Sequence, residues 1–265
     1  MGLCGDKSTT FLKSLGYNVV RHPSAALRPL DLIGVQRESL YLGPLNLLLS
    51  NSPGGLPKLQ TDVPAADING QSSSKLDVGI GASILAGLIA ALGKGTLGAA
   101  SSYTDAQTLE FSYSDVMNDQ VVPLEVGSYL RNGSVDQENK ILAEYVLGNG
   151  TLYLVTKVAK SRKFTVTYER KNGTAAKVDV PTLQGAVGGS VTVTTDGMRR
   201  NVVSYEGAAP LTFAFQCFAV GVEDGTLNLT AVRAGGVVAA ATGGAVDQPQ
   251  LLAGHGLLAL QGLPA

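Results

Sequence analysis

Tryptophan is absent from this sequence, and cysteine, histidine and charged residues are scarce. Aromatic residues make up 6% of the 265 positions, too few for the stacking platforms that bind single-stranded nucleic acid. Lysine plus arginine (20) balances aspartate plus glutamate (21), so no net basic field attracts nucleic acid. Two cysteines and two histidines exclude a disulfide framework and a zinc cage built from those residues. We therefore expect no nucleic-acid partner, no metal and a reducing compartment.

Motifs for catalysis and cofactor binding are missing as well. Residues 79–81 begin like a dinucleotide fingerprint, but Ile84 stands where the third glycine belongs. Gly95 replaces the hydroxyl residue that a phosphate-binding Walker loop requires. The GxSxG and HExxH motifs are absent, and neither His22 nor His255 has an obvious catalytic partner nearby in the sequence. We expect no enzymatic activity, no catalytic residue and no cofactor; a hydrolase that uses His22 or His255 is the enzymatic alternative.

The sequence is rich in glycine, with 33 residues, and 45% of it is hydrophobic, which predicts a core interrupted by many turns. Alternating apolar residues predict several half-buried strands, and helical spacing predicts two short helices. Cys217 lies in the most apolar strand and is expected to be an inert core thiol. Residues 27–34 are predicted to be a turn that leads into a strand, and residues 51–76 are predicted to be a long loop. The predicted helices are Ser8–Leu15 and Asp136–Leu147, and the further predicted strands are 108–113, 152–154, 164–168, 178–180, 187–193 and 211–222.

Basic residues are concentrated in residues 151–177, where Glu169 is the only acidic residue. The apolar alternation on both sides of residues 160–163 predicts a strand, a basic connection and a second strand. Two interpretations remain open: a solvated basic hairpin, or a surface that contacts anionic lipid head groups. The candidate lipid-contacting residues are Lys157, Lys160, Arg162 and Lys163.

Val78–Gly93 is a run of sixteen residues without a charge. As a helix it would reach about 24 Å, which is short of the ~30 Å hydrocarbon core of a bilayer. The run is therefore either a core helix or a segment that is stored against the protein body and later transferred to lipid.

The two ends of the chain are also informative. No secretory signal is expected, and Cys4 lies in a glycine-flanked segment where it is either an unmodified thiol or accessible to an acyl donor. Residues 234–250 are expected to be an exposed linker that proteases can reach. Residues 251–265 are apolar, and such a tail is expected to pack on the body rather than remain exposed.

Taken together, these features resemble the bacterial gasdermins. The resemblance rests on the MGLCGD start, the FLKSLGY segment that follows it, the alternating strands around the basic residues and the short apolar tail. It covers essentially the whole chain. It implies an α+β fold with a twisted, mostly antiparallel central sheet and surrounding helices, which converts in the membrane to a large oligomeric β-barrel pore.

The resemblance also implies how such a protein is controlled. Residues 1–247 would form the pore-forming domain, and residues 248–265 would be an autoinhibitory peptide. A caspase-like or other protease would remove this peptide, with Gly244, Ala245, Val246 and Asp247 as candidate cleavage positions. Cys4 would carry a covalent palmitoyl group.

The function implied by the resemblance is permeabilisation of the bacterial inner membrane, which causes cell death in antiphage defence. The expected partners are further copies of the chain, membrane lipids and the protease. The protein would be cytoplasmic when inactive and at the inner membrane after cleavage. The alternative is a non-lytic lipid-binding or interaction protein of α+β fold.

Overall fold

The computed structural model describes residues 12–51, 54–65, 106–136, 138–146, 148–170, 190–196, 200–223, 226–230, 232–233, 236–237, 251–252 and 258–263. Within them most residues belong to strands. The strands are β1 (Asn18–Ser24), β2 (Asp31–Val35), β3 (Ser39–Pro44), β4 (Leu49–Asn51), β5 (Gln60–Pro64), β6 (Ala106–Ser114), β7 (Met117–Gln120), β8 (Ser134–Val135), β9 (Thr151–Arg170), β10 (Ser190–Asp196), β11 (Arg200–Glu223), β12 (Thr226–Thr230), β13 (Val232–Arg233), β14 (Gly236–Val237) and β15 (Leu260–Gln261). The helices with complete bounds are the 3-10 turn η1 (Leu45–Leu47), α3 (Pro123–Arg131) and α4 (Lys140–Val146). Residues 12–14, which lie within the first predicted helix, are also helical.

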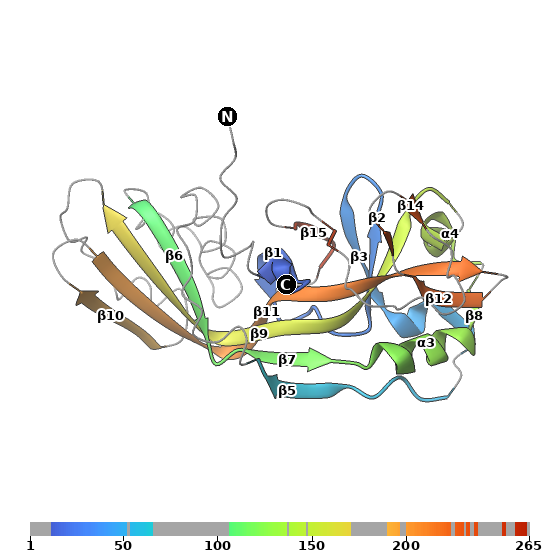
Figure 1. Cartoon of the computed structure of the whole chain (residues 1–265), viewed down its shortest axis with the longest axis horizontal. Coiled ribbons are helices and arrows are strands. Elements are labelled where there is room, and N and C mark those ends of the chain that lie inside the picture. Colours follow the sequence, from blue (N-terminus) through green and yellow to red (C-terminus); the bar gives the residue numbers. More distant parts are fainter. Residues whose placement is uncertain are drawn as a thin grey trace.

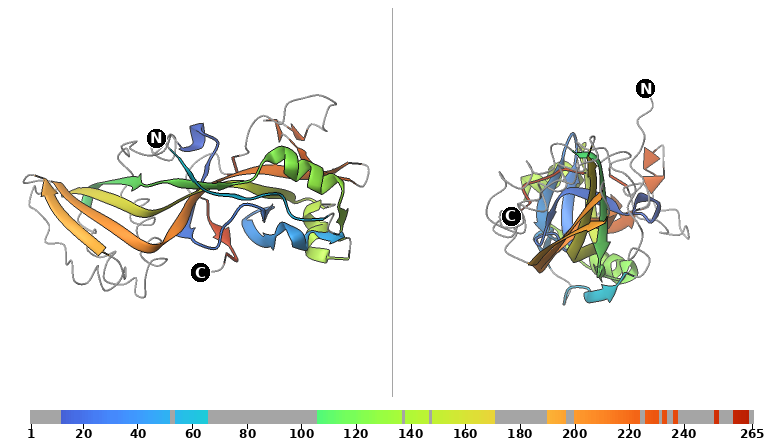
Figure 2. Two further views of the ribbon diagram at one scale, coloured as in Figure 1. Left: turned by 90° about the horizontal axis from the view of Figure 1, so that it is seen from below. Right: turned by 90° about the vertical axis from the view of Figure 1, so that its left-hand side faces the viewer.

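Two very long antiparallel strands, β9 and β11, run through the whole molecule (Figures 1 and 2). At one end they pair with β6 and β10, giving a four-stranded antiparallel sheet in the order β6-β9-β11-β10, which we call the wing. At the other end they pair with β1, β2, β7 and β12, and this part, with its helices, we call the body. The wing and the body therefore share two continuous strands.

The strand pairing is irregular where the wing meets the body, a region that we call the junction. Lys163 lies opposite Glu206 and Ser161 lies opposite Leu211, so residues 207–210 of β11 bulge opposite Arg162 alone. At the same level the chain passes from β6 to β7 through Asp115, which has a positive φ of 50°. Bulges bend strands and increase their twist, and the sheet bends there (Figure 2).

In the body, the sheet curls until its two edges are joined by the end of the chain. The strand order β1-β11-β9-β2-β3-β15 ends with β15 parallel to β3, while Leu258 forms a parallel bridge to Val20 of β1. Residues 258–261 therefore contact both edges of the same sheet. The result is a nearly closed ring of strands.

Helices cover the far end of the body. α3 begins with proline at its first turn and ends with Arg131, and its buried face packs against β12. Val126 and Leu130 of α3 belong to an apolar core that also contains Leu152 and Leu154 of β9 and Phe218 of β11. α3 was not predicted, because a nine-residue helix leaves only a short periodic signal in the sequence.

Several predicted elements are confirmed. The strand expected at the end of residues 27–34, the strand at 108–113 and the apolar strand at 211–222 correspond to β2, β6 and β11. The second predicted helix is confirmed as α4, which begins at Lys140 rather than Asp136. The α+β class with a twisted, mostly antiparallel sheet is confirmed.

Two predictions are wrong. Residues 160–163 do not connect two strands; they lie within the single strand β9. Buried and exposed side chains stop alternating at a bulge in β9, where Val155 and Thr156 are both buried. Because the apolar pattern is interrupted there, the sequence of one bent strand resembles that of two strands. The loop predicted for residues 51–76 contains the strand β5, whose polar sequence, QTDVP, carries no strand signal because the side chains are mostly exposed.

Candidate functional site

The end of the chain is held between β1 and β3 by backbone hydrogen bonds. The Leu258 N–H donates to the Val19 carbonyl at 2.8 Å, and the Arg21 N–H donates to the Leu258 carbonyl at 2.8 Å. On the other side Leu260 and Gln261 pair with Ser39 and Leu40 in a parallel register. We call the space between residues 19–21 and residues 39–40 the edge slot, and residues 251–263 the C-terminal segment (β1, β3 and β15 in Figure 1).

Below the edge slot lies an apolar core to which the C-terminal segment contributes. The Leu258 side chain is 7% exposed and lies in the core, whereas the next residue, Ala259, is exposed to solvent. Leu252, Leu260 and Leu263 pack against the same core. The buried residues that share it with Leu258 are Val20, Leu27, Ile33, Val155, Val158, Phe215 and Cys217. The prediction that the apolar tail packs on the body is confirmed for the described residues.

A buried amide holds the start of the C-terminal segment. Asn18 is 2% exposed, and its Oδ1 accepts a hydrogen bond from the Leu252 N–H at 2.6 Å. Its Nδ2 donates to the Cys217 Sγ at 3.7 Å. Because a buried amide is costly unless it is hydrogen-bonded, Asn18 fixes where the segment enters the sheet. Sequence reasoning missed Asn18, which lies in an otherwise ordinary strand.

Cys217 is fully buried, and burial raises the pKa of its thiol far above the usual range. The thiolate required for nucleophilic or redox chemistry is therefore not formed at neutral pH. The prediction of an inert core thiol is confirmed.

A second buried polar group lies beside this core. Asp31 accepts a hydrogen bond from the Arg28 N–H at 2.7 Å and another from the Tyr41 hydroxyl, and the Tyr41 ring packs against the core under the edge slot. Burial raises the pKa of Asp31 to about 6, although the Arg28 and Tyr41 contacts oppose this shift. This carboxyl group changes its charge in a pH range where most aspartates are already ionised.

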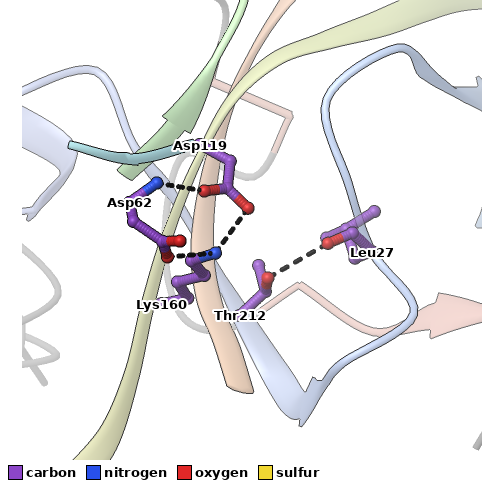
Figure 3. A network of polar contacts seen from close by, with 5 residues as sticks. All are labelled: Leu27, Asp62, Asp119, Lys160 and Thr212. Atoms are coloured by element: carbon purple, nitrogen blue, oxygen red, sulfur yellow. Dashed lines mark hydrogen bonds and ion pairs between the residues drawn. The ribbon is translucent and has the colours of Figure 1, made fainter. Parts of the chain in front are cut away.

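Of the four candidate lipid-contacting residues, Lys160 lies at the junction in an ion-pair network. Its Nζ is 2.7 Å from Asp119 Oδ2 and 2.9 Å from Asp62 Oδ1, and the Asp62 N–H donates to the other oxygen of Asp119 (Figure 3). Burial disfavours the charged form of Lys160, but the two carboxylates outweigh burial and raise the pKa of Lys160 above its usual value. The network ties β5, β7 and β9 together.

The other three candidates have different surroundings. Lys163 is paired with Asp115 at 2.9 Å and with Glu206 at 3.6 Å, and the hydrogen bond and charge of Asp115 raise the pKa of Lys163. Arg162 is exposed. Lys157 Nζ lies 5.9 Å from the centre of the Tyr17 ring. In this conformation, two of the four cations are therefore already neutralised by carboxylates.

The junction is also fixed by uncharged groups. The Ser161 hydroxyl accepts a hydrogen bond from the Lys163 N–H at 2.9 Å and lies 2.5 Å from the Ser114 carbonyl, so it links β9 to the end of β6. Thr212 Oγ1 donates to the Leu27 carbonyl at 3.0 Å, which links β11 to the turn before β2 (Figure 3). Together these contacts set the bend between the wing and the body.

The remaining predicted sites lie outside the described residues. Cys4, the cleavage positions 244–247 and Val78–Gly93 belong to this group. His255 does too, and only the backbone of His22 is described, in β1. Among the residues that the structure covers, no three histidine, cysteine, aspartate or glutamate side chains gather as metal ligands would. No helix in the described part of the chain has the length and apolar character needed to cross a bilayer.

The fold of this chain, with its two long strands shared by the wing and the body, matches that of a gasdermin. The chain is similar to a solved bacterial gasdermin from Bradyrhizobium tropiciagri, with a TM-score of 0.65 over 97% of this chain and 96% of that one, at 18% sequence identity. At that identity, the likeness establishes the fold alone.

The sequence comparisons establish the family. A family model described as the Bacterial Gasdermin Family matches residues 20–226. The chain is 42% identical to the Gasdermin bGSDM of Vitiosangium sp. over 99% of this chain and all of that protein. It is 35% identical to the Gasdermin bGSDM of a Desulfuromonadales bacterium over 84% of each chain. The chain therefore belongs to the bacterial gasdermin family, and gasdermins are pore-forming proteins rather than enzymes.

Proposed function

We propose that this chain is a pore-forming protein that its own C-terminal segment keeps inactive until a protease cuts the chain. Residues 1–247 would form the pore, and residues 248–265 would be the autoinhibitory peptide. The observation that carries the proposal is that residues 258–261 join both edges of the body sheet, with Leu258 in its core. Loss of these residues would leave both edges of the body sheet without their partners and remove Leu258 from its core.

The wing supports a role for strands in the pore wall. Its four antiparallel segments comprise β6, residues 163–170 of β9, β10 and residues 200–206 of β11. Backbone groups in lipid must be paired, and adjacent strands already meet that requirement within a sheet. A transmembrane strand needs about 9–11 residues, so the wing strands would lengthen as they insert and pair with those of neighbouring copies.

The ion pairs at the junction suggest how the wing is restrained before activation. Lys160 and Lys163 are paired with aspartates and glutamate in this conformation. In the inserted state, the same lysines, with Lys157 and Arg162, would exchange these carboxylates for anionic head groups. The protein would be cytoplasmic before cleavage and would then permeabilise the bacterial inner membrane, killing the cell in antiphage defence.

The Cys4 thiol is proposed to carry a palmitoyl group that strengthens insertion, because an acyl chain adds about 0.8 kcal/mol of membrane affinity for each buried CH₂ group. Intact-mass spectrometry of the purified protein should show one palmitoyl adduct that is absent from Cys4→Ala. An unmodified mass contradicts lipidation but leaves the pore proposal standing.

Expression in bacteria tests the function itself. Residues 1–247 should depolarise the inner membrane and stop growth on induction, whereas the full chain should be tolerated. Cleavage within residues 244–247 by a caspase-like or other protease should reproduce the effect of truncation once the cut peptide has dissociated from the body. A truncated chain that accumulates without harm contradicts the proposal and favours a non-lytic lipid-binding protein.

A further inference from the structure

The contacts of the C-terminal segment all lie on the carboxyl side of the proposed cleavage positions. Among the described residues they begin at Leu252, which donates to Asn18, and continue through Leu258 to Leu263. A cut within residues 244–247 therefore breaks none of the described contacts. Cleavage and departure of the peptide are two separate events.

We infer that the edge slot is a peptide-binding site. It binds an extended apolar peptide with the sequence of residues 248–265 even when that peptide is a separate molecule, no longer covalently attached to the body. The inference rests on the proposed function for its biological meaning, but binding can be measured without it. The ligand class is an extended peptide that is added to a sheet edge through its backbone.

The walls of the edge slot suit such a ligand. On the β1 side, Val19 supplies a carbonyl acceptor and Arg21 supplies an N–H donor, and both are satisfied by Leu258 at 2.8 Å. On the β3 side, Ser39 and Leu40 supply the partners of Leu260 and Gln261. The segment is parallel to both walls, and a peptide of the same sequence is expected to bind in the same direction.

The floor of the slot selects side chains. Leu258 enters the core between the two edges, whereas Ala259 is exposed. Because side chains alternate between the two faces of a strand, the peptide must carry an apolar residue at position 258 but tolerates a polar residue at position 259.

A polar side-chain contact lies near each end of the segment. The Leu252 N–H donates to Asn18 Oδ1 at 2.6 Å, and the Gln261 Nε2 donates to Glu38 Oε2 at 2.7 Å. The second contact is exposed and contributes little. The first is made by a buried amide and sets where the peptide begins.

Covalent attachment holds the peptide at a high effective concentration beside the slot, and cleavage removes this advantage. The cut protein is then a two-component complex whose dissociation depends on its concentration. Free peptide in excess should restore the inactive state, and weaker tails should release the body sooner.

The test uses the full chain with a specific protease sequence placed at residues 242–247. The protein is cut, and peptide retention is followed by native mass spectrometry on dilution. Fluorescence anisotropy then measures binding of a labelled 248–265 peptide to the emptied body. Three tails are compared: the natural sequence, Leu258→Asp, and the matched control Ala259→Asp.

The natural peptide should bind saturably and remain bound after the cut. Leu258→Asp should bind at least about 100-fold more weakly, because it places a carboxylate in an apolar core. Ala259→Asp should bind within about threefold of the natural peptide, since that side chain faces solvent. If the emptied body precipitates, the rate of peptide loss from the freshly cut complexes gives the same comparison.

Absence of saturable binding up to about 1 mM peptide, with immediate loss after the cut, overturns the inference. Equal binding of the two aspartate variants also overturns it, because the slot would then not select the buried side chain. Failure of the proposed function is a different result: the peptide binds as described, but the emptied body never makes lipid vesicles leak.

Discussion

Lys160 illustrates how one side chain can connect three strands. Its ammonium group bridges Asp62 of β5 and Asp119 of β7 from within β9, and the Lys160 and Asp119 side chains are each 14% exposed. The sequence showed a run of cations, which is typical of lipid contact, but not their partners. Those partners lie 41 and 98 positions earlier in the chain, and no spacing rule relates them.

Replacing this lysine should destabilise the folded state. Lys160→Ala leaves Asp119 largely buried without its counter-charge, so the free energy of unfolding should fall by about 2 kcal/mol. Urea denaturation with matched slopes measures the change. The control is Lys140→Ala on α4, an exposed position where a change within about 0.5 kcal/mol is expected. Equal stability of the two variants contradicts the importance of the network.

Asp31 should make the free energy of unfolding decrease as the pH rises from about 4 to about 6, the opposite of the effect of an ion-paired aspartate. Folding raises its pKa from 3.8 to about 6, so the folded protein binds this proton more tightly than the unfolded chain. The resulting stabilisation is present below pH ~4 and is lost as the pH rises to about 6, by about 2 to 3 kcal/mol.

Asp31→Asn removes this titration and keeps an oxygen acceptor for the Arg28 N–H. Between pH 4 and pH 6.5 the natural chain should therefore lose stability relative to the variant, as measured by urea denaturation at each pH. Parallel stability curves for the two proteins would show that the carboxyl group titrates normally.

Two glycines in different elements have opposite structural roles. Gly34 of β2 lies against the Tyr145 ring of α4, and a Cβ there would be 2.5 Å from Tyr145 Cε1. Gly127 lies inside α3, where an added Cβ meets nothing within 4 Å. The close approach at Gly34 brings α4 onto the sheet.

Alanine substitutions should separate these roles. Gly34→Ala should lower the free energy of unfolding by about 1–3 kcal/mol, because the ring must move in a packed region. Gly127→Ala should raise it by up to about 1 kcal/mol, because alanine favours the helix. Thermal unfolding followed by circular dichroism gives both changes. Destabilisation of similar size at both positions contradicts the account of α4 packing.

Elements with a strong local signal could be predicted from the sequence. The dense apolar run of β11 and the turn that leads into β2 are examples, and both are confirmed. The continuity of β9 could not be predicted, because bulges interrupt its alternation at positions that only the partner strand determines. α3 and β5 were missed for a related reason: one is short, and the other exposes most of its side chains.

In the whole molecule, the resemblance to bacterial gasdermins predicted the family, and the apolar composition of the tail predicted that it packs on the body. It did not predict that the last residues join both edges of one sheet. That arrangement depends on the curl of β9 and β11, which brings β1 and β3 to within one strand of each other. Residues far apart in the sequence, such as Asn18 and Leu252, then become partners.

The measurement that tests the account most directly is dye release from anionic lipid vesicles by one sample of the full chain before and after it is cut within residues 242–247. The account predicts no release from the uncut protein, and rapid release once the cut sample is diluted so that residues 248–265 leave the edge slot. Vesicles that stay sealed after the peptide has left, or that leak equally with the uncut chain, would contradict the claim that the C-terminal segment controls a pore.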